Sequence, residues 1–232
     1  MTQCLTAVAC VLIRMPQDRK NEVKEKYKMK NILLMGATGT AGSAITKKLL
    51  SDTDYHLTLF ARHAKNMYSD SHRVTVVNGD ARKIDDLKKA LRGQDVVGCF
   101  IPGYDLPLIA KNLVAAMDEN GMKRLIFTGA VGIYNEIPDE IGGAYNVDNE
   151  PPQVPNRKAV DSIETSDLDY TILRPGFLRS GSEDDFVLTV KGEPAKGYAT
   201  TIPSLVKLVV KIISDPTLYV RESVSITQNL AK

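Results

Sequence analysis

The stretch 31-NILLMGATGTAGS-43 decides the fold, because it joins a short apolar run to three glycines that stand three residues apart. A strand that ends in such a glycine turn and leads directly into a helix is typical of a phosphate-binding loop. In this interpretation Gly36 allows the sharp turn, Gly39 lets the backbone approach a pyrophosphate, and Gly42 lets the helix pack closely on the sheet. The alternative is a turn that needs small residues for structural reasons alone.

Beyond this loop, strand-like and helix-like patterns alternate to the end of the chain. Apolar runs predict strands within 31–36, 55–62, 73–80, 95–103, 123–130, 169–176 and 221–227. Helical spacing predicts helices within 41–51, 81–93, 106–121, 156–166 and 202–215, two of them ending at a glycine and the last with Pro203 in its first turn. This alternation predicts a single α/β domain with a doubly wound, mostly parallel sheet and helices on both faces.

Two stretches interrupt the alternation, at residues 132–155 and 177–200. The first is rich in Gly and Pro, and the second includes "VKGEPAKG", for which we expect a hairpin. Both follow the carboxyl ends of strands, where ligands bind in open α/β sheets. We therefore expect both to be functional loops on the substrate side of the domain.

Composition limits the classes of partner. The chain has 232 residues, 43% of them hydrophobic and 25% charged, with a formal net charge of +2. This balance, with no dense basic run, argues against a nucleic-acid partner. Three cysteines, Cys4, Cys10 and Cys99, show neither metal-ligand spacing nor a disulfide framework, which fits a reducing, cytoplasmic compartment.

The first 28 residues differ in character from the rest. "CLTAVACVLI" is too short to span a bilayer, so we expect no membrane partner, and the charged stretch after it is typical of a solvated tail. We expect residues 1–28 to lie outside the fold, residues 29–232 to form the domain, and Met29 to be a possible alternative start. The other interpretation is a short helix docked on the surface.

The end of the second predicted strand bears on the choice of cofactor. An NAD site usually has an acidic residue there, to bind the ribose 2′-hydroxyl. Here Arg62 and His63 follow the strand instead, and a guanidinium suits a 2′-phosphate, so the sequence favours NADP over NAD. Asp80, after the third strand, is expected to reach the adenine, to cap the next helix, or both; a solvated surface role is the alternative for Arg62.

Four motifs together resemble one family. "GATGTAG", "NGDAR", "KRLIFTGAVGIY" and "DLDYTILRPGFL" are similar, in order and spacing, to atypical short-chain dehydrogenase/reductases, in the NAD(P)H-binding branch of NmrA-like and flavin-reductase-like proteins. The resemblance covers about residues 30–228 and implies a Rossmann fold with NADP along the strand ends. It also implies a set of cofactor-binding residues, namely Gly36, Thr38, Gly39, Thr40, Ala41, Gly42, Arg62, Asp80, Lys158 and Pro175.

The chain departs from the main family at its catalytic positions. That family uses a serine and a Tyr-x-x-x-Lys motif, whereas Gly129 and Ala130 stand where serines are usual. Lys158 fits the lysine position, but Val154 stands four residues earlier and cannot donate a proton. Lys158 remains a candidate for holding the ribose, with a solvated helix lysine as the alternative.

Two other residues are candidate substitutes for the missing proton donor. Thr128 ends the fifth predicted strand, and its alternative role is a buried hydroxyl bonded to backbone. Tyr134 lies in the first long loop. We expect Cys99 to be a buried core thiol and the acidic run 183–185 to be a charged loop, with no metal site.

Two functions follow from these patterns. The first is an NADPH-dependent reductase of a small electrophile such as a flavin, quinone or carbonyl compound, whose substrate the sequence does not identify. The second is a non-catalytic NADP(H)-binding redox sensor that contacts a protein partner, and the missing serine and tyrosine favour it. A flavin or quinone accepts hydride with little help from a protein acid, which fits the first hypothesis.

Overall fold

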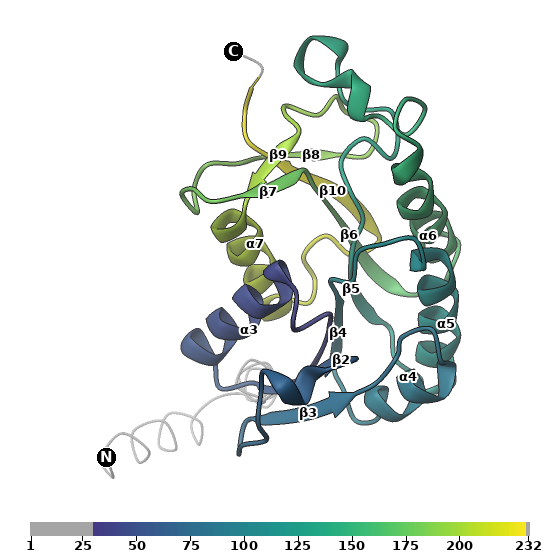
Figure 1. The fold of residues 1–232 in the computed structure, drawn as a ribbon, viewed down its shortest axis with the longest axis vertical. Coiled ribbons are helices and arrows are strands. Elements are labelled where there is room, and N and C mark those ends of the chain that lie inside the picture. The colour runs from purple at the N-terminus through teal and green to yellow at the C-terminus, as the bar shows by residue number, and fades with distance from the viewer. Residues whose placement is uncertain (1–29, 231–232) are drawn as a thin grey trace, which may run out of the picture. The chain divides into compact units, whose positions relative to one another are not determined.

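One large sheet runs through the part of the chain that the computed structural model describes, residues 30–230 (Figure 1). The strands are β1 (Asn31–Met35), β2 (His56–Ala61), β3 (Val74–Asn78), β4 (Val96–Cys99), β5 (Arg124–Thr128), β6 (Asp169–Pro175), β10 (Glu222–Thr227) and β8 (Val187–Val190). Their order across the sheet is β3-β2-β1-β4-β5-β6-β10-β8, and all pairs are parallel except β10 with β8. The expectations for residues 1–28 and for Met29 concern residues outside the described range.

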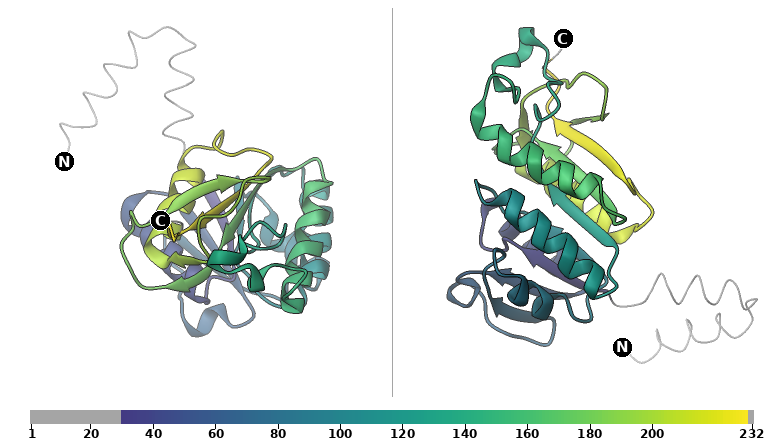
Figure 2. Two further views of the ribbon diagram at one scale, coloured as in Figure 1. Left: turned by 90° about the horizontal axis from the view of Figure 1, so that it is seen from above. Right: turned by 90° about the vertical axis from the view of Figure 1, so that its right-hand side faces the viewer.

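Helices cover both faces of this sheet, as the sequence predicts. On one face α4 (Ile84–Leu91), α5 (Leu106–Glu119) and α6 (Val154–Glu164) share a core with the strands, and on the other face α3 (Thr40–Asp52) and α7 (Ile202–Ser214) do. The views of Figure 2 show α5 and α6 side by side on their face. The central strands β1, β4, β5 and β6 are buried on both sides, which explains why their sequences are nearly continuous apolar runs.

The predicted helix ends are confirmed in detail. Gly93 and Gly121 follow α4 and α5 with φ of +71° and +67°, the left-handed conformation that ends helices at glycine. Pro203 occupies the first turn of α7, where a missing N–H costs no helical hydrogen bond. No helix within residues 30–230 is long and apolar enough to cross a membrane.

The second long stretch differs from its prediction. Residues 177–200 contain the strands β7 (Phe177–Arg179) and β8 and the start of β9 (Ala199–Thr201), and β7 pairs with β9 in parallel. The chain does turn at Gly192, with φ of +95°, but β8 pairs with β10 and β9 pairs with β7. The expected hairpin at 190–197 is therefore wrong, because the strands on either side of the turn join different sheets.

The first long stretch, 132–155, is a folded loop with short 3₁₀ turns, η2 (Asp139–Ile141), η3 (Gly143–Tyr145) and η4 (Pro151–Gln153). It packs against the segment before β9 through a small apolar cluster of Val131, Ile137 and Ala195. The two stretches therefore form one layer beyond the carboxyl ends of β5 and β6.

The strand order reverses direction between β1 and β4. From β1 the chain crosses through α3 on one face to β2, whereas from β4 it crosses through α5 on the other face to β5. A crevice opens at the carboxyl ends of two strands whose connections diverge in this way, and ligands bind there in doubly wound proteins.

Candidate functional site

The glycine loop lies at this reversal point and has the backbone that its sequence requires. Gly36 has φ of +79°, and a Cβ there would stand 2.8 Å from the Phe100 carbonyl oxygen. A Cβ on Gly42 would collide with the Gly36 carbonyl, so close packing of α3 on the loop depends on this glycine. Both roles agree with the sequence analysis.

Gly39 is different from the other two glycines. It is the N-cap of α3 with φ of −78°, and a Cβ there would meet only the Gly36 carbonyl oxygen, at 3.4 Å. Gly39 therefore has ordinary backbone geometry and faces open space. It leaves α3 without a side-chain cap, and the first turn of α3 holds no acidic residue, so its N–H groups favour an anion.

A cleft of about 320 Å³ opens in front of this loop. We call it the glycine-loop cleft; the residues that line it are Gly36, Thr38, Gly39, Phe60, Ala61, Arg62, His63, Gly79, Asp80, Ala81, Arg82, Phe100, Ile101, Pro102, Gly103, Tyr104, Asp105 and Ile109. They follow the carboxyl ends of β1, β2, β3 and β4. Arg62 and His63 are exposed at the end of β2, where the sequence places the 2′-phosphate of NADP.

The carboxylates of this cleft are bound to one arginine. Asp80 accepts hydrogen bonds from the Arg82 backbone N–H at 3.0 Å and from Arg82 Nη2 at 2.7 Å, and Arg82 also pairs with Asp105 at 3.4 Å. These hydrogen bonds lower the pKa of Asp80 to about 2. Asp80 does not cap α4, whose N-cap is Lys83, so the capping alternative is wrong.

The residues of the cleft fit a dinucleotide. The first turn of α3 offers donors to a pyrophosphate, with Gly39 leaving the space that an approaching phosphate needs. Thr38 lines the cleft and Thr40 is exposed beside it. The Ala41 side chain packs against the core under α3, so only its backbone could reach a ligand.

A second pocket, of about 300 Å³, lies beyond the ends of β5 and β6. We call it the ring pocket; the residues that line it are Ala130, Val131, Tyr145, Glu150, Pro152, Gln153, Asn156, Pro175, Gly176, Phe177 and Tyr198. It is formed by both long stretches and by the start of α6. Pro175, expected to bind cofactor, lies here rather than in the glycine-loop cleft.

Three aromatic rings from separate segments form one wall of the ring pocket. The ring centroids of Tyr145 and Phe177 are 4.9 Å apart at an interplanar angle of 77°, and those of Tyr145 and Tyr198 are 5.3 Å apart at 36°. Phe177 is 57% exposed, so much of its ring is not covered by protein. Within residues 30–230, neither tyrosine hydroxyl forms a hydrogen bond to another side chain or to backbone.

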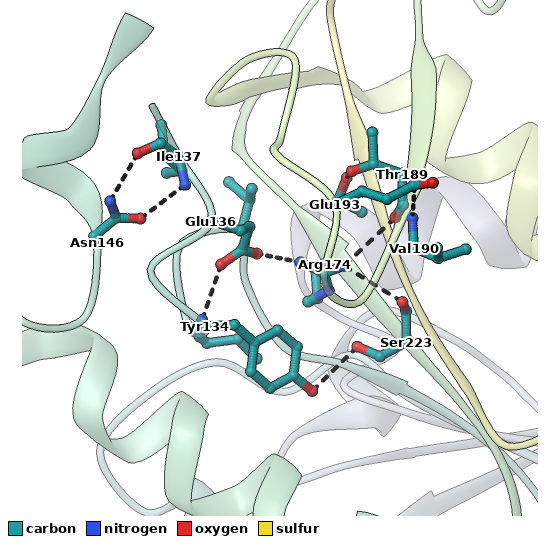
Figure 3. Close-up of polar contacts among 12 residues, drawn as sticks. Tyr134, Glu136, Ile137, Asn146, Arg174, Thr189, Val190, Glu193 and Ser223 are labelled. Carbon is teal, nitrogen blue, oxygen red and sulfur yellow. Dashed lines mark hydrogen bonds and ion pairs between the residues drawn. The ribbon is translucent and has the colours of Figure 1, made fainter. Parts of the chain in front are cut away.

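A buried ion pair behind the ring pocket holds the first long loop to the sheet (Figure 3). Arg174 of β6 is fully buried and pairs with Glu136, which also accepts a hydrogen bond from the Tyr134 N–H at 2.8 Å. Arg174 also donates to the carbonyl oxygens of Thr189 and Ser223. The loop that carries Tyr145 is thus joined to β6, β8 and β10.

Glu136 also joins the two long stretches to each other. Its carbonyl oxygen accepts a hydrogen bond of 2.8 Å from the Ala195 N–H, three residues before Tyr198. Nearby, the Asn146 side chain exchanges two hydrogen bonds with the backbone of Ile137, at 3.0 and 2.8 Å (Figure 3). The relative positions of Tyr145 and Tyr198 therefore depend on this network.

The structure places Tyr134 in the network rather than in either site. Its hydroxyl donates to Glu164 at 2.8 Å and lies 3.2 Å from Ser223 Oγ, and its ring lies under the charged groups of Arg157 and Lys191. Burial raises the pKa of Tyr134. Tyr134 lines neither the glycine-loop cleft nor the ring pocket, so its placement favours a structural role over proton donation.

Two further predicted site residues also lie outside both pockets. Lys158 is exposed on α6 and lines neither pocket, whereas Asn156, two positions earlier on the helix, faces the ring pocket. Thr128 ends β5, and its Oγ1 is buried with no hydrogen-bond partner among the described residues. The expected backbone bond of Thr128 is therefore absent.

Cys99 and the acidic run 183–185 lie as the sequence analysis expects. Cys99 is a free, buried thiol, and burial raises its pKa to about 12, so it is not a nucleophile at neutral pH. In the acidic run, Glu183 and Asp184 pair with Lys207, and Asp185 accepts from Gln228. Residues 30–230 contain no cluster of His, Cys, Asp and Glu that could hold a metal ion.

Several pocket residues were not identified from sequence. In the glycine-loop cleft they are Arg82, Tyr104 and Asp105, although "IPGYD" follows a predicted strand and its position could have indicated them. In the ring pocket they are Glu150, Gln153, Asn156, Tyr145, Phe177 and Tyr198. The three aromatic residues fall within the long stretches predicted to be functional, but no local pattern shows that their rings meet.

Comparison with known proteins agrees with this geometry. The model of a family described as NAD(P)H-binding matches residues 36–216. A Rossmann-fold NAD(P)-binding family protein from Shigella flexneri is 33% identical, with a TM-score of 0.73 over 86% of this chain and 94% of that one. A short-chain dehydrogenase/reductase from Veillonella parvula, solved in complex with NADP, is 27% identical, with a TM-score of 0.77 over 86% and 94%.

Two further matches give less information about this chain. The anaerobillin reductase ChuY from Escherichia coli O157:H7 is 20% identical, with a TM-score of 0.72 over 87% of this chain and 98% of that one, a likeness of fold alone. The N-acetyl-alpha-D-glucosaminyl-diphospho-ditrans,octacis-undecaprenol 4-epimerase of the same strain is 28% identical over 125 residues, 47% of this chain. The match spans only 36% of the epimerase's length.

Proposed function

The chain belongs to the NAD(P)H-binding family, and we propose that it is an NADPH-dependent reductase of a small electrophile, a flavin, quinone or carbonyl compound. The observation that carries this proposal is the succession of two pockets along the carboxyl edge of one sheet. The glycine-loop cleft spans β3 to β4, and the ring pocket begins at the neighbouring β5.

The distance between the two pockets suits a dinucleotide. From β2, where Arg62 stands, to β5 there are three strand spacings, about 14 Å at roughly 4.8 Å each. A cofactor with its 2′-phosphate at Arg62 and its pyrophosphate at Gly39 would bring its nicotinamide to the ends of β4 and β5. The ring pocket would then hold the acceptor.

Charge favours NADP over NAD in this arrangement. Arg62 is exposed at the end of β2, and the carboxylates of the glycine-loop cleft, Asp80 and Asp105, are both paired with Arg82. A 2′-phosphate would therefore meet a cation without meeting an unpaired carboxylate.

The protein's part in the reaction is to bind, orient and exclude water. When bound, NADPH supplies a hydride, which is the cofactor's own chemistry. The aromatic wall of the ring pocket would align a flat acceptor, and the proton that completes reduction would come from solvent or from the hydroxyl of Tyr145 or Tyr198.

The alternative is a redox sensor that binds NADP(H) without turnover. The observation that favours it is Ala130 in the ring pocket, at one of the two positions where serines are usual in the main family, with the apolar Val131 next to it. A sensor would place a partner protein, rather than a small acceptor, against Phe177.

Steady-state oxidation of NADPH separates the two functions. We expect the full chain to oxidise NADPH in the presence of a quinone, riboflavin or an aromatic aldehyde, and Gly39→Val to abolish the reaction. Binding of NADPH, measured by calorimetry, with no oxidation on any of these acceptors would reject the reductase and favour the sensor.

A further inference from the structure

We propose that the ring pocket selects uncharged, flat, conjugated acceptors and rejects anionic ones, with Glu150 as the residue that sets this preference. The inference rests on the proposed function, because it takes the ring pocket as the place of the acceptor. It narrows the acceptors to one chemical class, of which an unsubstituted quinone is the simplest member.

The shape of the pocket supports a flat ligand. Tyr145 lies 4.9 Å from Phe177 and 5.3 Å from Tyr198 between ring centroids, and the rest of the lining includes prolines and small apolar residues. Aromatic faces and edges stabilise a conjugated ring by offset or edge-to-face stacking. The uncovered ring of Phe177, 57% exposed, is a surface that such a ligand would cover.

The charge of the pocket supports a neutral ligand. No lysine or arginine of residues 30–230 lines the ring pocket, so an anionic substituent has no cation to pair with there. Its one charged lining residue in that range is Glu150, which is half-buried and forms no ion pair with the described residues. A sulfonate or carboxylate on the ring would meet this carboxylate in a site partly shielded from water, where repulsion is stronger than in bulk solvent.

The polar groups of the pocket support a ligand with carbonyl oxygens. Asn156 donates from Nδ2 to Gln153 Oε1 at 2.9 Å, and Gln153 donates from Nε2 to the Val131 carbonyl at 3.0 Å. Gln153 Nε2 also lies 3.5 Å from the Tyr145 carbonyl oxygen, so its donors are used within the protein, and the second N–H of Asn156 Nδ2 is the amide donor that a ligand could take. The tyrosine hydroxyls described above add donors that could reach a carbonyl oxygen.

The glycine-loop cleft shows the contrast. That site presents Arg62 and the uncapped start of α3, both suited to phosphate, and its carboxylates are paired with Arg82. The ring pocket presents three rings and one carboxylate that forms no ion pair with the described residues. The two pockets therefore differ in the charge that they favour. The anionic cofactor has favourable groups in the glycine-loop cleft and none in the ring pocket.

The test uses a pair of probes that differ by one anionic ring substituent, 1,4-naphthoquinone and 1,4-naphthoquinone-2-sulfonate. Binding of each to the full chain with saturating NADP⁺ is measured by calorimetry, which needs no turnover. We expect the uncharged quinone to bind at least about tenfold more tightly than the sulfonate. Equal or tighter binding of the sulfonate would overturn the proposal, and so would failure of both probes to bind while NADP⁺ still binds.

Variants of one residue test the cause. Glu150→Gln should narrow the difference between the probes, and Glu150→Lys should reverse it, with NADP⁺ affinity unchanged as the check that the fold is intact. Glu140→Lys, an exposed residue of the same loop that does not line the pocket, should leave the preference as it is. If Glu140→Lys shifts the preference as much as Glu150→Lys, the net charge of the loop, rather than Glu150, sets it, and the assignment is wrong.

Turnover distinguishes this inference from the proposed function. Selective binding of the uncharged quinone without oxidation of NADPH would support the pocket assignment and reject the reductase. Oxidation of NADPH with both probes at similar kcat/KM would support the reductase and reject the selectivity.

Discussion

At the scale of single residues, we expect the choice of cofactor to depend on one arginine. We expect wild-type protein to bind NADPH more tightly than NADH by about 1.5–3 kcal/mol, the usual contribution of a hydrogen bond to a charged group. In Arg62→Ala this difference should largely disappear, because the 2′-phosphate loses its cation while the pyrophosphate keeps its site at α3. Calorimetry with both cofactors on both proteins measures it.

A second arginine serves as the control for this experiment. Arg92 is exposed at the end of α4 and does not line the glycine-loop cleft, so Arg92→Ala should leave the difference between NADPH and NADH unchanged. Equal affinities for the two cofactors in the wild type would refute the role of Arg62.

The same substitution at two glycines of the loop should change two different properties, cofactor binding in one case and stability in the other. Gly39→Val places a branched side chain in open space where phosphate would sit, so cofactor binding should fall by about 100-fold or more while the fold persists. Gly42→Val drives a side chain into the Gly36 carbonyl, so the free energy of unfolding itself should fall. Urea unfolding measures the stability of both variants, and cofactor titration measures their binding. If Gly39→Val lowered the stability and left cofactor binding unaffected, a purely structural turn would be favoured.

At the scale of elements, the sequence and the structure suggest different roles for Tyr134, and a substitution can distinguish them. The sequence made it a candidate proton donor, whereas its hydroxyl donates to Glu164 and lies beside Ser223. Tyr134→Phe should lower the free energy of unfolding by about 1 kcal/mol, the worth of a typical hydrogen bond, and leave kcat nearly unchanged. A hundredfold loss of kcat with unchanged stability would restore Tyr134 as a catalytic residue.

The buried ion pair should matter to the ring pocket and not to the cofactor. Glu136→Gln leaves Arg174 buried without an anion, and removing one member of a buried pair costs about 3–5 kcal/mol. We expect a lower melting temperature and a raised KM for the acceptor, because the loop that carries Tyr145 loses its tie to β6. NADPH affinity should hold, because the glycine-loop cleft does not contact the pair.

If the single variant unfolds, a double variant still tests whether the ion pair positions the loop. Glu136→Leu with Arg174→Met removes both charges and fills similar volume, a replacement that is often neutral or stabilising. Recovered stability with a KM that stays raised would show that the pair positions the loop. A wild-type KM in the double variant would contradict that role.

The fold was predictable where residues close in sequence decide it. The loop from β1 to α3, the glycine stops of α4 and α5 and the order of strands and helices depend on local spacing, and all of these predictions are confirmed. The pairing of β8 with β10 was not predictable, because the turn at Gly192 is a local signal whereas the choice of partner strand depends on packing across the sheet.

The same distinction applies to the site. The glycine loop of its proposed cofactor half is one contiguous motif and could be placed from sequence, whereas Arg82, Tyr104 and Asp105 come to the cleft from other loops. Its acceptor half is assembled from segments between Ala130 and Tyr198 whose rings meet only in three dimensions. The lysine position of the main family's motif was the local signal available there, and it pointed to Lys158 rather than to Asn156, which lines the pocket.

For the whole molecule, cofactor binding and stability are linked. A ligand that binds only the folded state at 100 times its Kd adds about 2.7 kcal/mol to the free energy of unfolding. In a domain of this size each kcal/mol raises the melting temperature by about 2–4 °C, so saturating NADPH should raise it by about 5–11 °C.

NADH at the same concentration should give a smaller rise, because it lacks the phosphate that Arg62 would bind, and Gly39→Val should give almost none. Differential scanning calorimetry on the full chain makes the measurement. If millimolar NADPH or NADH leaves the wild-type melting temperature unchanged, the proposal that a dinucleotide binds in the glycine-loop cleft is wrong. The reductase and the sensor would then fail together, since both require that cofactor in that place.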